Sequence, residues 1–140
     1  PAAWDRTPAK VRQPYEFLTA ALRALGTPKD RIARWRPGQI RRFILTPLAR
    51  MGQPYEAPPG PDGWPEAAEA WITPPALAER LSWAMNVKTV HGGPLPAPLD
   101  FAETALGDHL TDDLATAVRR AESKRAGVGL VLAAPAFNRR

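Results

Sequence analysis

The two histidines are the side chains best suited to acid, base or metal chemistry near neutral pH. The run GDHLTDD places three carboxylates around one of them, His109: Asp108, Asp112 and Asp113. Nitrogen and oxygen atoms of this kind can bind a divalent metal ion. Acids are equally typical of the first turn of a helix, where they face the positive end of the helix dipole, and Thr111 fits its N-cap. We expect the helix-capping role and no metal site.

The second histidine, His91, lies in the run VHGGP, which superficially looks like the oxyanion loop of esterases. No Gly-x-Ser-x-Gly nucleophile elbow accompanies it, and the chain has no His-Glu-x-x-His zinc motif and no phosphate-binding glycine loop. The chain also has no cysteine, which excludes disulfides, thiolate zinc sites and cysteine nucleophiles. We therefore expect no catalytic residue and no cofactor in this sequence.

The positive charge of the chain is concentrated in one basic patch. Residues 29–42 hold six bases against one acid; without them the chain has 13 bases and 13 acids, since 19 and 14 occur in total. Arginines around Trp35 can contact phosphates while the indole stacks on bases, but they can equally face an acidic protein surface or solvent. We expect no specific nucleic-acid binding. The arginines of the patch are Arg31, Arg34, Arg36, Arg41 and Arg42.

The loop MGQPYEAPPGPDGWP, residues 51–65, combines stiff backbone with aromatic rings. Its Pro-Asp-Gly run, 61–63, predicts a turn in which Gly63 takes a positive φ. Burial of Trp64, with Tyr55 or Trp71 nearby, would fasten the loop to the helices like a clasp, because a buried aromatic ring stabilises a fold by a few kcal/mol. We expect this structural role for the loop.

The alternative for the same loop is a groove that binds a sugar or a peptide. Four side chains would then converge on one concave surface: Tyr55, Asp62, Trp64 and His91. If these four side chains line one pocket, the binding groove is favoured. If they are scattered, the structural role of the loop is favoured.

The elements that must position these residues are predicted to be helices joined by proline-rich loops. A proline inside a helix costs about 3 kcal/mol, so the 17 prolines must lie at helix starts and in loops. Pro47 is expected to kink or split one helix at Thr46. The apolar end of the chain, 126–140, fits a buried helix or a strand. The sequence predicts an all-α fold, a compact bundle of about six short helices forming a single domain over 1–140. Helices are expected over 14–25, 38–51, 65–71, 75–87, 101–106 and 112–121.

Four segments, PYEFLTAALRALG, MGQPYEAPPGPDGWP, AWITPPALAERLSWA and LVLAAPAFNRR, follow one another in an order that resembles the C-terminal end of bacterial domain-of-unknown-function 1800 proteins. The arginine-rich segment 29–42 departs from that pattern, and Ala134, Ala136 and Asn138 stand where the pattern has Ser, Glu and Gln. The matching positions are Gly52, Gln53, Pro54, Pro58, Pro59, Asp62, Gly63, Trp64, Pro65, Trp71, Arg80 and Phe137.

The resemblance implies a mostly helical protein, longer than this chain and in many cases exported, with no established activity. It supplies no catalytic residue and does not determine the cellular compartment of the protein. Our leading hypothesis is a non-catalytic helical module that packs on the remainder of its parent chain or on another protein. The alternative is part of an enzyme or of a carbohydrate- or peptide-binding protein whose cleft is completed by a missing N-terminal region. No apolar run approaches the roughly 18–20 residues of a membrane span.

Overall fold

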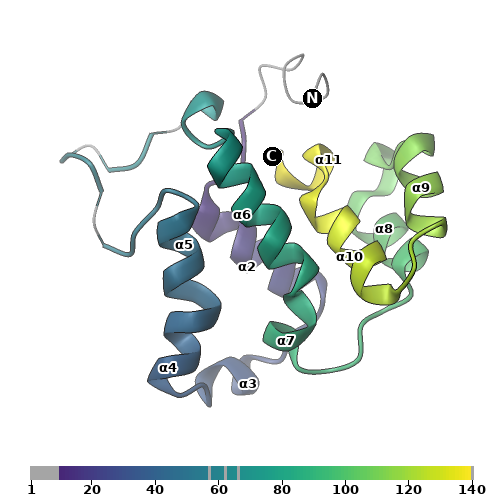
Figure 1. Cartoon of the computed structure of the whole chain (residues 1–140), viewed down its shortest axis with the longest axis horizontal. Coiled ribbons are helices and arrows are strands. Elements are labelled where there is room, and N and C mark those ends of the chain that lie inside the picture. The colour runs from purple at the N-terminus through teal and green to yellow at the C-terminus, as the bar shows by residue number, and fades with distance from the viewer. Residues whose placement is uncertain (1–9, 57, 62, 66, 140) are drawn as a thin grey trace.

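The computed structural model describes residues 10–139 except 57, 62 and 66. Every regular element in these residues is a helix, and the isolated bridge between Val11 and Arg139 joins the two ends of the described chain. The all-α prediction is confirmed, but six helices is too low a number. The additional short helices are α3, α7 and α11 (Figure 1); only α11 among these starts at a proline, Pro135.

The first half of the chain forms α2 (Pro14–Ala24), α3 (Lys29–Ala33), α4 (Pro37–Ile40), a π-helical segment η1 (Arg41–Leu45) and α5 (Thr46–Arg50).

No gap separates the last three of these segments, although a kink or split was expected near Pro47. The helix instead widens into π geometry over Arg41–Leu45, and α5 begins at Thr46 with Pro47 in its first turn. A proline lacks the N–H that would continue the α pattern, and a π segment lets the neighbouring backbone groups find other partners. The buried indole of Trp83 donates to the carbonyl of Phe43 within this segment, at 2.9 Å.

The second half forms a 3-10 turn η2 (Ala68–Ala70), α6 (Pro74–Met85), α7 (Val87–His91), α8 (Pro98–Leu106), a 3-10 turn η3 (Gly107–His109), α9 (Asp112–Arg119), α10 (Lys124–Ala133) and α11 (Pro135–Asn138).

Local capping defines several of these helix starts. Thr73, Thr111 and Ser123 each accept a hydrogen bond from the backbone N–H three residues later. Of the helix expected over 65–71, the described residues form only the short η2 turn, and the apolar end of the chain is helical in α10 and α11. The choice between helix and strand for that end is thereby resolved.

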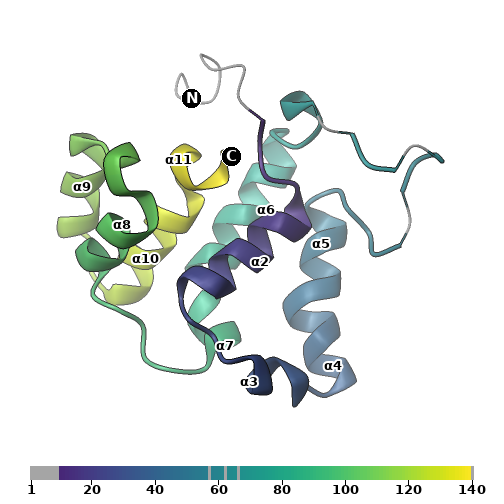
Figure 2. The ribbon, with the colours of Figure 1, turned by 180° about the vertical axis from the view of Figure 1, so that it is seen from behind.

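The helices pack around α10. It contacts α6 on one side and α8 and α9 on the other. Helix α2 crosses behind α6 in the view of Figure 1 and in front of it in Figure 2, and α5 lies on the side of α6 away from α10. Gly129 permits the close approach of α10 to α6, because a Cβ at this position would lie 2.5 Å from Sδ of Met85. None of the helices in the described part of the chain is long and apolar enough to cross a membrane.

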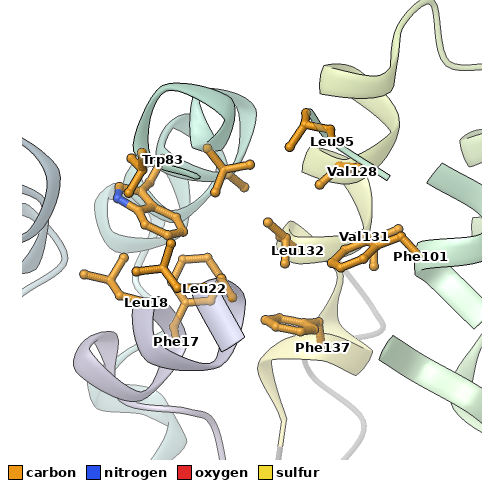
Figure 3. Close-up of a cluster of buried hydrophobic side chains, with 14 of the residues drawn as sticks. Phe17, Leu18, Leu22, Trp83, Leu95, Phe101, Val128, Val131, Leu132 and Phe137 are labelled. Atoms are coloured by element: carbon orange, nitrogen blue, oxygen red, sulfur yellow. The ribbon is translucent and has the colours of Figure 1, made fainter. Parts of the chain in front are cut away.

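The core joins the two ends of the chain. Phe17 of α2 makes edge-to-face contacts with Trp83 of α6 and Phe137 of α11, with ring centroids 5.6 and 6.3 Å apart. Figure 3 shows Leu132 and Phe137 facing the rings and aliphatic side chains of α2 and α6. The buried cluster takes side chains from α2 through α11.

Candidate functional site

The proline-rich loop is fastened to the start of α2 by two glutamines. The buried Gln53 accepts a hydrogen bond from the backbone N–H of Tyr15 at 2.8 Å and donates to Oε1 of Gln13 at 3.1 Å. Gln13 in turn donates to the carbonyl of Pro65 at 3.3 Å. Both ends of the loop therefore meet at the N-terminus of α2, where backbone N–H groups lack partners within the helix.

The aromatic rings of the loop region are buried to different extents. Trp71 is 2% exposed and its indole N–H donates to the carbonyl of Pro65 at 2.9 Å. Trp64 is only half-buried, and its ring centroid lies 6.1 Å from that of Trp71. The sequence predicted Trp64 as the main buried ring, whereas the structure gives that place to Trp71. Tyr55 is 63% exposed, and the charge of Glu56 raises the pKa of its phenol.

The predicted turn is confirmed in its described residues. Gly63 has φ +83°, and its N–H donates to the carbonyl of Gly60 at 3.1 Å. The fourth proposed ligand-binding residue, Asp62, lies outside the described residues.

His91 lies at the opposite end of α2 from the loop. Its Nδ1 shares a hydrogen bond with the hydroxyl of Thr27 at 2.7 Å, just beyond the C-terminus of α2, whereas Gln13 and Tyr15 hold the loop at the N-terminus. Helix α2 has 11 residues, so its two ends are about 16 Å apart. The structure therefore does not bring His91 together with Tyr55 or Trp64. Figure 2 shows α7 and the loop at opposite ends of α2.

Burial lowers the pKa of His91, and the positive charge of Arg31 lowers it further. Arg31 donates to the carbonyls of Val90 and Thr89 at the C-terminus of α7, at 3.1 and 3.2 Å. Its guanidinium covers Gly92, which has φ +78° and where a Cβ would lie 2.0 Å from Cζ of Arg31. Arg31, predicted as part of the basic patch, is thus a helix-capping residue.

The other arginines of the basic patch are exposed. Arg34 lies 3.7 Å from Asp30 in an ion pair across one helical turn, and the guanidinium of Arg42 lies over the ring of Phe43. Arg36 and Arg41 are also exposed.

Trp35, in the middle of that segment, points inward. It is 8% exposed and makes an edge-to-face contact with Phe43 at 5.3 Å. Its buried indole N–H has no hydrogen-bond partner in the described residues. The ring is therefore not placed to stack on a nucleic-acid base.

The acids near His109 occupy the positions that helix capping requires. The hydroxyl of Thr111 accepts from the N–H of Leu114 at 3.2 Å, and Asp112 and Asp113 lie in the first turn of α9. The described residues contain no group of three or more His, Asp or Glu side chains gathered to hold a metal ion.

A buried arginine links α6 to both ends of the chain. Arg80 is 2% exposed; its guanidinium donates to Oδ1 of Asn138 at 2.8 Å and to the carbonyl of Arg12 at 2.6 Å. It lies over the ring of Phe17, 5.2 Å from the centroid. Desolvation lowers the pKa of Arg80 to about 10, so the side chain stays charged at neutral pH. Asn138 completes the network by donating to two carbonyls at the end of α10.

A groove of about 480 Å³ lies between α2 and the segment 27–44. Buried Leu18, Leu22 and Trp35 line it, together with Tyr15 and Ile32, which are 57% and 36% exposed. Sequence reasoning missed this groove because it followed the face of α2 that enters the core. The signal was present as Tyr15, which lies outside the predicted apolar face of α2, and as Ile32 in the following basic segment.

A family model described as a protein of unknown function (DUF1800) matches residues 1–139. The chain belongs to the DUF1800 family. Comparisons with curated proteins and with solved structures gave no match. The positions that carried the resemblance to DUF1800 proteins include several that make the structural contacts above: Gln53, Pro65, Trp71, Arg80 and Phe137.

Proposed function

We propose that this DUF1800 chain is a non-catalytic helical module that binds another protein or the remainder of its parent chain. The observation that carries the proposal is the apolar groove beside α2. Tyr15 and Ile32 leave large apolar surface in water there, next to the buried Leu18 and Leu22. Contiguous exposed apolar surface of this kind is typical of interaction sites, because contact of apolar surface with water is unfavourable and a bound partner removes that contact.

The placement of the polar side chains supports a structural module. Gln53 holds the proline-rich loop, Arg80 holds Asn138, and His91 bonds to Thr27. Each of these groups already has a partner that serves the fold. We also propose that residues 1–140 form one domain, since a single buried cluster takes side chains from α2 through α11.

Photo-crosslinking tests the interaction directly. A photoreactive phenylalanine analogue replaces Ile32 in the groove or, as a control, Leu81 of α6, which is 44% exposed and lies outside the groove lining. In cells that produce the protein, we expect a discrete crosslinked protein from position 32 and background from position 81. The crosslinked protein is then purified and its affinity for the chain measured. Crosslinks to many proteins at equal yield from both positions would contradict the proposal.

A second candidate function is carbohydrate or peptide binding at the loop 51–65, as part of a cleft completed by other residues. The exposed ring of Tyr55 favours it, since a tyrosine offers a flat apolar face and a hydroxyl that can donate a hydrogen bond. Calorimetric titration with cello- and chito-oligosaccharides tests it. Tyr55→Ala should abolish binding, whereas Tyr15→Ala, at a similarly exposed ring on α2, should retain it. Absence of heat with every oligosaccharide removes the carbohydrate version.

A further inference from the structure

One face of α2 forms a wall along the whole length of the groove. The positions repeat every three or four residues, which places them on one side of a helix. With 11 residues α2 is about 16 Å long, so the groove is elongated. The lining residues on this wall are Tyr15, Leu18, Thr19, Leu22, Arg23 and Gly26.

The opposite wall is formed by Ile32, Trp35 and Ile44. Both walls are helical or lie between helices, and neither presents a strand edge. A groove between two helical walls can accept a third helix, whose apolar residues at i, i+3, i+4 and i+7 enter it.

Exposed apolar surface continues beyond the groove. Five large hydrophobic side chains are exposed in the described residues; Tyr15 and Ile32 line the groove, and Ile40, 38% exposed, lies four residues before the lining residue Ile44. A surface that extends past the cavity fits a macromolecular partner better than a small ligand, which would be enclosed by the cavity itself.

The charges at the rim are positive. Arg23 and Lys29 are exposed lining residues, and no acid belongs to the described lining. The basic segment 29–42 begins at the rim, while the rest of the chain has equal numbers of bases and acids. Asp30 offsets only Arg34, with which it forms an ion pair. Charge complementarity therefore favours an acidic partner.

We propose that the groove between α2 and residues 27–44 binds an amphipathic helix of a partner protein, with an apolar stripe in the groove and acidic residues facing Arg23 and Lys29. This inference rests on the proposed interaction function and names the partner's chemistry. The apolar stripe supplies the affinity through burial of Tyr15 and Ile32, and the rim charges set the preference for acidic sequences.

The test uses a fluorescein-labelled synthetic peptide of about 18 residues, long enough to form a helix. It carries Leu on the apolar stripe and Glu elsewhere; a matched peptide carries Lys in place of Glu. Fluorescence anisotropy at about 0.15 M salt should give a micromolar Kd for the Glu peptide and at least tenfold weaker binding for the Lys peptide. Raising the salt to about 1 M should narrow that difference, because screening weakens exposed charge pairs.

Variants locate the binding site. Ile32→Asp should weaken binding of the Glu peptide at least tenfold, whereas Leu81→Asp, which adds the same charge at a similarly exposed apolar position, should leave it unchanged. The double variant Arg23→Glu/Lys29→Glu should reverse the preference and bind the Lys peptide more tightly. Circular dichroism melts confirm that each variant is folded. Equal affinity for both peptides, or unchanged binding by Ile32→Asp, would overturn the proposal.

The same variants distinguish two other possible occupants of the groove. A dimer seen by light scattering and dissociated by Ile32→Asp would place a second copy in the groove and overturn the proposal. The protein could bind laurate but not the Glu peptide, and Ile32→Asp could abolish the binding of laurate. That result would assign the groove to a small anionic amphiphile and overturn the proposal. If the photoreactive residue placed at Tyr55 of the loop captures a partner and the one at Ile32 does not, the interaction function stands and the assignment of this groove fails.

Discussion

Replacement of Gln53 by methionine should destabilise the protein strongly, although the neighbouring loop residues Gly52 and Pro54 are exposed. Gln53 is 6% exposed, and its side chain accepts from the N–H of Tyr15 and donates to Gln13. Methionine has nearly the same volume but cannot accept the backbone bond. The N–H of Tyr15 then loses its partner at the first turn of α2, where no carbonyl of the helix can replace it.

The expected loss follows from these two bonds. A polar group left without a partner in a buried place costs about 1–3 kcal/mol, and the bond to Gln13 contributes about 1 kcal/mol more. The free energy of unfolding should therefore fall by roughly 2–4 kcal/mol. For a chain of this size the melting temperature should fall by about 3 °C for each kcal/mol.

Gln13→Met is the matched control. Gln13→Met removes the acceptor of the Gln53 amide N–H and the donor to the carbonyl of Pro65, but it leaves the bond from the Tyr15 N–H to Gln53 in place. The expected loss is therefore smaller, about 1–2 kcal/mol. Urea unfolding of both variants gives the free energies, and hydrogen exchange of the Tyr15 amide gives a local check. If the two variants lose equal stability, or if the Tyr15 amide keeps its protection in Gln53→Met, the glutamine contacts do not fasten the loop.

The remaining predictions concern three other buried contacts. Trp71→Ala should cost about 3–5 kcal/mol and Trp64→Ala clearly less, by thermal melts, because only Trp71 is fully buried; the reverse order would restore Trp64 as the anchor. Arg80→Met should lower the free energy of unfolding by about 3 kcal/mol in urea, since the oxygens that it contacts lose their donor; a neutral effect would mean that the guanidinium is dispensable. Because the pKa of His91 is lower in the folded state, the unfolded state takes up a proton at a higher pH than the folded state does. The free energy of unfolding should therefore keep its full value above about pH 6.5 and fall as the pH drops below it. His91→Asn should remove this part of the pH dependence, measured by urea midpoints on either side of that pH; an unchanged slope would assign it to other groups.

Much of the helical architecture could be predicted from the sequence because the signals are local. A hydroxyl at Thr111 bonds an N–H three residues away, and Pro14 and Pro74 fit the first turns of α2 and α6 whatever surrounds them. The positive φ of Gly63 was equally predictable, because its turn is made within four residues.

The number and length of the helices were less predictable. The stretch 65–71 carries helix-forming residues, yet it forms only the 3-10 turn η2 before Trp71 enters the core. The helix around Pro47 adopts π geometry where the indole of Trp83, distant in sequence, bonds to Phe43. Propensity alone does not encode such a contact.

The sequence by itself determined the helical class, the capped and proline-started helices and the position of the basic segment, since each depends on residues within a few positions of one another. Only the tertiary structure decided which aromatic ring anchors the loop, that Gln53 and Arg80 are buried hydrogen-bonding residues, and that His91 lies at the far end of α2 from Tyr55. It also decided that the face of α2 with Tyr15, which shares Leu18 and Leu22 with the core, lines an apolar groove. These features arise where segments far apart in the chain meet, and the energy of burying a side chain depends on what the opposing segment places against it.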